Sequence, residues 1–342
     1  MKTLFLDNNE PNIRTAGKIL RDGGLVAIPT ETVYGLAANA LDGAAVARIF
    51  AAKGRPMDNP LIVHIQDLSE LDSLVAYVPQ AVYDLAGRFW PGPLTIILPK
   101  SDLIPDEVSA GLDTVAIRMP SHPAARAVIR AAGVPLAAPS ANTSGKPSPT
   151  TAAHVRDDMD GKIDAILDGG PCEVGVESTV LTLCAPVPRI LRPGRVTPEE
   201  LEEVLGEVDI DPAVLGQLGA GEVAASPGMK YKHYAPNADV FIVESSLEAF
   251  RSFVNQQDPQ TTAALVFSGE EEGLRCTVLP FGDEGNELAH ANKLFADLRE
   301  CDTRGMKNVY VRCPSSEGVG LAVMNRLLRA AEFRVLTLEE DA

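Results

Sequence analysis

Basic and hydroxyl-bearing side chains gather in four parts of the chain, each beside a short apolar run. These parts are PTETVYGLAANA (29–40), KGRPMDNPLIVH (53–64), RMPSHP with PSANTSGKPSPT (118–123, 139–150), and GGPCEVGVESTVL with ILRPGRVTP (169–181, 190–198). Guanidinium, ammonium and hydroxyl groups are the donors that bind phosphate and carboxylate oxygens. The pattern therefore predicts a site for an anionic substrate.

Other catalytic patterns are missing from the sequence. SANTSGKPS lacks a P-loop because Ser140 stands where that loop needs Gly and Pro147 replaces its Ser or Thr. We find no Ser/His/Asp order, no carboxylate pair at a useful spacing and no metal-ligand cluster, and the five cysteines contain no C-x-x-C pair. Catalysis would then consist of positioning and charge neutralisation.

Each part also has a purely structural interpretation. Thr30 and Thr32 fit a helix cap or a turn, and Lys53 with Arg55 fits a solvated face. The run of Ser, Asn and Thr fits a loop, and His64 in an apolar strand fits a core histidine. Position favours binding, because ligands of open α/β sheets gather at the carboxyl ends of strands.

The elements that would position these residues alternate between helix and strand. Helical spacing of apolar residues, with Gly or Pro at the boundaries, predicts helices at 12–24, 43–54, 79–90, 122–133, 152–161 and 197–206. Short apolar runs predict strands at 25–30, 60–67, 94–100, 115–120, 135–140 and 163–170, and a hairpin at 178–183 and 189–194. This order predicts an α/β domain whose sheet is covered by helices.

The length of 342 residues favours two domains. We expect the first at 1–205, a linker at 206–237 and a smaller α/β domain at 238–342. The second domain shows strands at 238–245, 261–268 and 308–312 and helices at 246–254, 286–302 and 320–333. It carries no catalytic pattern of its own.

The balance of 47 acidic against 30 basic residues gives a formal net charge of −17. Such a chain repels a phosphate backbone, which argues against direct tRNA binding. The first residues do not resemble a signal peptide and no 18-residue apolar stretch occurs, so we expect a cytoplasmic protein without a membrane partner.

The segment SPGMKYKHYAP (226–236) is basic and aromatic in an acidic chain. A linker, a nucleic-acid contact and a flap over an anionic ligand would each explain it. Next to a nucleotide site the flap is favoured, because it would exclude water from a labile intermediate.

These parts, in this order, resemble the YrdC/Sua5 family, and the two-domain length resembles its Sua5-type members. The resemblance is carried by KGRP…NPL…H followed by PSAN.SG..SPT. It implies a YrdC-like twisted open sheet covered by helices, plus a smaller Rossmann-like C-terminal domain of the Sua5 type. One departure is visible: GVESTV is followed by Leu181 and Thr182, where many members have Asp.

The resemblance implies a nucleotidyltransferase that makes threonylcarbamoyl-AMP from L-threonine, bicarbonate and ATP, with Mg²⁺ accompanying ATP. Other proteins would then transfer the threonylcarbamoyl group to A37 of tRNA, giving t6A. By analogy the catalytic set is Lys53, Arg55, Ser140 and Asn142. The threonine side is Thr32, His64, Arg118, Ala138 and Ser178, and the ATP side is Arg55, Asn59, Thr114, Ser140, Ser148, Arg192, Tyr231 and Tyr234.

Two other functions compete with this one. A non-catalytic RNA-binding or ribosome-associated YrdC-fold protein would bind tRNA in a salt-sensitive way without nucleotide turnover. Carbamoyl transfer, as in hydrogenase maturation, would bring zinc-finger segments, and this chain has no C-x-x-C. The acidity and the Lys53, Arg55, Ser140 and Asn142 set favour the synthase.

Overall fold

The structure is a computed structural model that describes residues 2–216 and 234–338. The chain divides into two compact units. The first unit holds the residues up to Ser144 and continues from Ser148 through residue 216. The second unit holds residues 234–338 together with three residues of an earlier loop, Gly145–Pro147.

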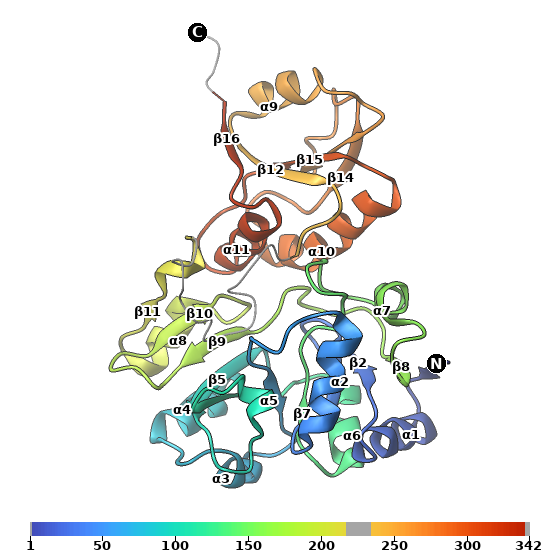
Figure 1. The fold of residues 1–342 in the computed structure, drawn as a ribbon. Helices are drawn as coiled ribbons and strands as arrows, with labels where there is room; N and C mark the ends of the chain where they lie inside the picture. The colour runs from blue at the N-terminus through green and yellow to red at the C-terminus, as the bar shows by residue number, and fades with distance from the viewer. Residues whose placement is uncertain (1, 217–233, 339–342) are drawn as a thin grey trace. The chain divides into compact units, whose positions relative to one another are not determined.

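The first unit is built on an 11-stranded mixed sheet (Figure 1). Its order is β1-β8-β2-β3-β7-β4-β6-β5-β9-β10-β11. The strands are β1 (Leu4–Asp7), β2 (Val26–Ile28), β3 (Gly35–Asn39), β4 (Ile62–His64), β5 (Leu94–Pro99), β6 (Thr114–Arg118), β7 (Leu136–Ala137), β8 (Ala165–Asp168), β9 (Thr179–Thr182), β10 (Arg189–Arg192) and β11 (Asp209–Ile210). β4 and β6 are parallel, as are β5 and β9, so these pairs present their carboxyl ends in the same direction.

The helices of the first unit cover both faces of this sheet. They are α1 (Glu10–Arg21), α2 (Gly43–Lys53), α3 (Leu71–Leu74), α4 (Gln80–Phe89), α5 (Asp106–Ser109), α6 (Pro123–Ala132), α7 (Ala152–Met159) and α8 (Pro198–Leu205), with short 3₁₀ turns η1 (Leu68–Glu70) and η2 (Pro212–Val214). Alternation along β2 separates the two cores: Val26 and Ile28 pack in one apolar cluster and Ala27 in the other.

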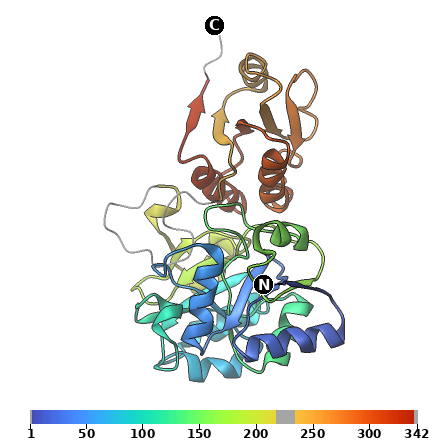
Figure 2. The ribbon, with the colours of Figure 1, turned by 45° about the vertical axis from the view of Figure 1, so that its right-hand side comes forward.

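Helices α1 and α6 lie side by side on one face, as both views show (Figures 1 and 2). Their close approach depends on Gly17, where a Cβ atom would lie 2.6 Å from the backbone carbon of Ala131. Any side chain at position 17 would force the two helices apart, and with them the strands that they cover.

The second unit is a five-stranded parallel sheet in the order β14-β13-β15-β12-β16. Its elements are β12 (Asp239–Glu244), α9 (Leu247–Val254), β13 (Thr262–Val266), β14 (Thr277–Pro280), α10 (Glu287–Thr303), β15 (Asn308–Arg312), α11 (Gly320–Ala330) and β16 (Val335–Thr337). Within this unit α9 lies on one face of the sheet and α10 and α11 lie on the other (Figure 1).

The mixed α/β class and the helices and strands expected from periodicity are confirmed. The structure adds the short strands β1, β3, β14 and β16 and the four-residue helices α3 and α5. β1 (LFLD) and β3 (GLAAN) contain no β-branched residue, so the sequence gives them little strand signal. Residues 209–214, expected in the linker, form β11 and η2 within the first unit, and β11 pairs with β10.

Candidate functional site

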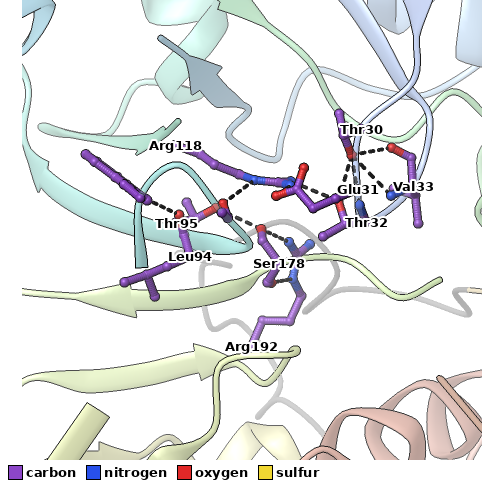
Figure 3. Close-up of polar contacts among 11 residues, drawn as sticks. Thr30, Glu31, Thr32, Val33, Leu94, Thr95, Arg118, Ser178 and Arg192 are labelled. Carbon is purple, nitrogen blue, oxygen red and sulfur yellow. Dashed lines mark hydrogen bonds and ion pairs between the residues drawn. The ribbon is translucent and has the colours of Figure 1, made fainter. Parts of the chain in front are cut away.

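Four segments of the first unit bring their polar residues together where strands end or begin (Figure 3). Thr30, Glu31 and Thr32 follow β2, and Arg118 ends β6. His64 ends β4 and is the direct register partner of Arg118. Ser178 immediately precedes β9. His64 and Arg118 thus lie at carboxyl ends of strands, as expected for ligand-binding residues of open α/β sheets, whereas Ser178 lies at the amino end of its strand.

Arg118 is the centre of this group and is only 4% exposed. Its Nη1 donates to Thr32 Oγ1 at 2.9 Å, its Nε donates to Gly92 O at 3.3 Å, and its Nη2 lies 2.7 Å from Glu31 Oε1 in an ion pair. A guanidinium carries five N–H donors, so these three contacts leave further hydrogens for a substrate carboxylate.

Glu31 was missed by the sequence analysis as a site residue, although it lies inside PTETVYG. Its carboxylate is buried, and neither oxygen has hydrogen-bond geometry with a donor among the described residues. Burial raises the pKa of Glu31, but the Arg118 guanidinium and the nearby N–H groups of Glu31 and Ser121 outweigh burial and hold it below its usual range. The group is therefore a charged carboxylate paired with Arg118 at physiological pH.

His64 is buried, and its Nδ1 lies 3.2 Å from Ile62 O. Burial and then the positive charge of Arg118 lower the pKa of His64 to about 3. The imidazole is thus neutral at physiological pH, which suits a hydrogen-bonding role rather than charge neutralisation.

Ser178 connects two predicted sets of residues. Its Oγ lies 2.8 Å from Thr95 Oγ1 and accepts a hydrogen bond from Arg192 Nη2 at 3.2 Å. Arg192 Nε also donates to Ser178 O at 3.1 Å. Arg192 ends β10, so the residue expected on the ATP side directly contacts one expected on the threonine side.

Lys53, Ser140 and Asn142 also lie together. The Lys53 ammonium, at the end of α2, donates to Ser140 O, to Asn142 O at 2.7 Å and to Asn142 Oδ1 at 3.3 Å. Lys53 is 2% exposed, so it fixes the 140–142 backbone from within the unit. Arg55 lies on the following loop, where its Nη2 donates to Asn59 O at 3.1 Å.

The remaining expected residues are spread along the same unit. Ala138 follows β7, and its N–H donates to Ile62 O at 3.0 Å. Ser148 is fully buried and donates to the carboxylate of Glu177, a second acid that the sequence analysis missed.

Thr114 begins β6, so it lies at the opposite end of that strand from Arg118, roughly 13 Å away for four residues of strand. Thr182 ends β9, and its Oγ1 accepts from Cys184 N at 3.2 Å.

The two expected linker tyrosines have different outcomes. Tyr231 lies outside the described residues. Tyr234 belongs to the second unit, is 1% exposed and stacks on Phe295 with ring centroids 5.2 Å apart, with the Arg326 guanidinium 5.7 Å from its ring centre. Contact between Tyr234 and ATP would therefore require this side chain to leave its buried position.

Two family models match the chain. Residues 18–194 match the Sua5/YciO/YrdC family model, which is described as telomere recombination. The chain belongs to the Sua5/YrdC family. Residues 196–332 match a second family model, described as the C-terminal domain of threonylcarbamoyl-AMP synthase.

Relatives in this family cover nearly the whole chain. Threonylcarbamoyl-AMP synthase from Pyrococcus abyssi is 47% identical over 336 residues, 96% of each chain. The enzyme of the same name from Bacillus subtilis is 47% identical over 335 residues, 97% of this chain and 96% of the relative. A crystal structure of P. abyssi Sua5 complexed with L-threonine superposes with a TM-score of 0.92 at 44% identity, covering 99% of this chain and 100% of that one.

The structure describes residues 2–216 and 234–338. Within these ranges no group of three or more His, Cys, Asp and Glu side chains could hold a metal ion. In the same ranges, no helix combines the length and the apolar character needed to cross a bilayer.

Proposed function

We propose that this chain is an L-threonylcarbamoyladenylate synthase, a nucleotidyltransferase that converts L-threonine, bicarbonate and ATP into threonylcarbamoyl-AMP and pyrophosphate. The observation that carries the proposal is the buried Thr32–Arg118 contact at the strand ends, joined in the same unit by Ser178 and Arg192. Its relative from P. abyssi has been crystallised with L-threonine, which supports an amino acid as one substrate.

The reaction proceeds in two balanced steps. The amino nitrogen of threonine bonds to the carbon of bicarbonate, water leaves, and an N-carboxylate forms. An oxygen of this carboxylate then bonds to the α-phosphorus of ATP while the bond from that phosphorus to the oxygen of the β-phosphate breaks, and pyrophosphate leaves. The attacking oxygen is already anionic, so the phosphoryl step needs no general base.

The threonine side consists of Thr32, His64, Arg118, Ser178 and the backbone of Ala138. Arg118 would bind the substrate carboxylate with its remaining N–H donors, and the neutral His64 and the hydroxyls would bind the uncharged polar groups. Glu31 pairs with Arg118 and offsets its charge, so binding of the carboxylate relies on the remaining N–H donors as well as on charge.

The ATP side consists of Arg55, Asn59, Thr114, Ser140, Ser148 and Arg192, with Tyr231 and Tyr234 as linker candidates. Arg55 and Arg192 would neutralise the negative charge that develops during displacement at the α-phosphorus. Lys53 supports this side indirectly, since its ammonium holds the backbone oxygens of Ser140 and Asn142. Asn142 completes the catalytic set through its side chain.

Mg²⁺ would arrive bound to ATP and be held mostly by phosphate oxygens and water, because the described residues offer no cluster of three acidic or metal-binding side chains. It would supply charge neutralisation on the leaving pyrophosphate. We further propose a cytoplasmic location and a downstream threonylcarbamoyl transferase that consumes the product in t6A synthesis.

The test is pyrophosphate release by the purified chain with ATP and Mg²⁺, leaving out threonine and bicarbonate in turn. We expect release only when both are present, and a loss of about 100-fold for Arg55→Ala, because a phosphate-neutralising donor is removed. Arg88→Ala is the matched control, since Arg88 makes an exposed ion pair with Glu203.

Pyrophosphate release that ignores both omissions would contradict the proposal. So would the absence of release together with salt-sensitive binding of tRNA, which would instead support an RNA-binding protein. An Arg55→Ala chain that no longer folds, judged by circular dichroism, would make Arg55 structural.

A further inference from the structure

Thr95 is a buried polar residue in the apolar strand β5. Its neighbours Leu94 and Ile96 are fully buried, and Thr95 itself is 0% exposed. Its register partners are Arg118 in β6 and Val180 in β9. The side chain therefore lies in the middle of the sheet, between the strand that carries Arg118 and the strand that follows Ser178.

The Thr95 hydroxyl contacts a functional group rather than a backbone carbonyl. Its Oγ1 lies 2.8 Å from Ser178 Oγ, while a guanidinium nitrogen of Arg192 donates to the same Ser178 oxygen at 3.2 Å (Figure 3). All three side chains are buried. The contact satisfies the buried Thr95 hydroxyl, which would cost stability without a partner. Valine has nearly the same shape but no hydroxyl, so it could not contact Ser178 in this way.

Counting donors and acceptors fixes the direction of the Arg192–Ser178 bond and leaves two directions for the Thr95–Ser178 bond. A serine hydroxyl has one proton to donate and two lone pairs to accept. Arg192 can only donate, so it occupies one lone pair of Ser178. If Thr95 donates as well, both lone pairs are used and the Ser178 proton is left for a third group.

We propose that Thr95 is a positioning residue that, together with Arg192, holds the Ser178 hydroxyl as a donor to an anionic oxygen of the threonine-derived substrate. A carboxylate has no proton to give, so it selects the arrangement in which Ser178 donates. This inference rests on the proposed function and assigns Thr95 a role in the same site.

The arrangement also links the two substrate sides. Arg192 is expected to contact ATP, and it donates to both the oxygen of the Ser178 side chain and the Ser178 carbonyl. A nucleotide that orders Arg192 therefore also orders Ser178. Threonine binding should become tighter when a non-hydrolysable ATP analogue is present, and the gain should depend on the Thr95 hydroxyl.

The experiment compares Thr95→Val, which removes the hydroxyl and keeps the shape, with Thr95→Ser, which keeps the hydroxyl. Calorimetry measures L-threonine affinity with and without the ATP analogue, and pyrophosphate release measures kcat and KM for each substrate. Thr262→Val is the matched control. Like Thr95, Thr262 is a fully buried threonine in a strand, but it lies in β13 of the second unit.

We expect Thr95→Val to weaken threonine binding about tenfold and to lose the gain from the analogue, while Thr95→Ser stays within about threefold of the parent. The KM for ATP should change less than the KM for threonine. Thr262→Val should leave both unchanged.

Equal losses for Thr95→Val and Thr95→Ser would overturn the inference, as would a Thr95→Val chain with parental threonine affinity. A Thr95→Val chain that loses only thermal stability would show a structural role and overturn it too. A parent chain that neither binds threonine nor releases pyrophosphate would overturn the proposed function and this inference together, whereas parental turnover with an unaffected Thr95→Val overturns the inference alone.

Discussion

Two Arg–Glu pairs, one buried in the first unit and one partly buried in the second, use the same side chains in different ways. Arg118 and Glu31 have 4% and 6% exposed side chains, and Arg312 and Glu270 have 11% and 12%. In the first pair Glu31 has no oxygen in hydrogen-bond geometry with a described donor. In the second, Arg312 Nε donates to Glu270 Oε2 at 3.1 Å and Nη2 donates to Oε1 at 3.2 Å.

The rest of the Arg312–Glu270 pair is also fully engaged. Arg312 Nη1 donates to Ser245 O at 2.7 Å, and Glu270 Oε2 accepts from Phe267 N at 3.2 Å. A partly buried pair of this kind joins the ends of β12, β13 and β15 and has little capacity for a ligand. The Arg118–Glu31 pair has fewer hydrogen bonds to its surroundings, and Arg118 keeps N–H hydrogens beyond its contacts with Thr32, Gly92 and Glu31, which the proposed substrate carboxylate would accept.

The largest effect expected from this difference is on threonine binding. Arg118→Lys keeps the charge but removes the planar fork that contacts both Thr32 and Gly92. We expect kcat/KM for threonine to fall about 100-fold or more, because charge-assisted hydrogen bonds contribute about 1.5–3 kcal/mol each. The measurement is pyrophosphate release over a range of threonine concentrations. Parental kinetics in Arg118→Lys would remove the basis of the comparison.

The same substitution in the second unit should act on stability instead. Arg312→Lys cannot keep both bonds to Glu270 and the bond to Ser245, so the free energy of unfolding should fall by about 1–3 kcal/mol. Chemical denaturation followed by circular dichroism measures it. The KM for threonine should stay at the parental value, and a large rise in KM would mean that Arg312 also serves the substrate site.

The smallest effect concerns the histidines beside these regions. Burial lowers the pKa of both His64 and His290, but the second cause is Arg118 at His64, whereas at His290 a hydrogen bond to Asp283 and nearby acids oppose burial. An unfolded histidine binds a proton below a pKa of about 6.5 and folded His64 does not until about 3. The contribution of neutral His64 to the free energy of unfolding is therefore fully present above pH 6.5, and it is lost as the pH drops from 6.5 toward 3.

In that window the unfolded chain binds one proton at His64 that the folded chain does not, so the free energy of unfolding falls by about 1.4 kcal/mol for each pH unit that the pH drops. His64→Gln should flatten the fall in unfolding free energy between pH 6.5 and 5 by up to that amount, and His290→Gln should flatten it less. Denaturation at several pH values tests this. An unchanged slope in His64→Gln would show that the folded chain protonates His64 readily.

The sequence predicts the strands that carry His64, Arg118 and Ser178, whereas their roles as threonine-side residues come from the family resemblance. The expected strands at 60–67, 115–120 and 178–183 contain His64, Arg118 and Ser178, and the structure shortens them so that β4 ends at His64, β6 ends at Arg118 and β9 begins after Ser178. The pairing register then brings His64 opposite Arg118. Apolar runs thus predict which strands carry these residues, and the pairing of the strands sets which residues face one another.

The supporting residues could not be predicted in the same way. Thr95 lies within a strand, and only the pairing of β5 with β9 places its hydroxyl near Ser178. Lys53 fits an exposed cation by composition, yet α2 packs so that its ammonium meets the backbone at residues 140–142. Glu31 lies between two threonines in the sequence, and its ion pair with Arg118 depends on where β6 ends in space. Such contacts arise from tertiary packing, which local sequence does not specify.

The chain's single tryptophan lies in the segment that supports this site. Trp90 is 8% exposed, and its indole nitrogen donates to Leu94 O at 2.7 Å. Leu94 immediately precedes Thr95, and Gly92, two residues after Trp90, accepts a hydrogen bond from Arg118. Indole emission depends on the polarity and order of its surroundings, and no second tryptophan contributes to the signal. The protein therefore carries a native optical reporter, and substrate binding at the Arg118 end of the sheet can be followed by fluorescence without attaching a dye.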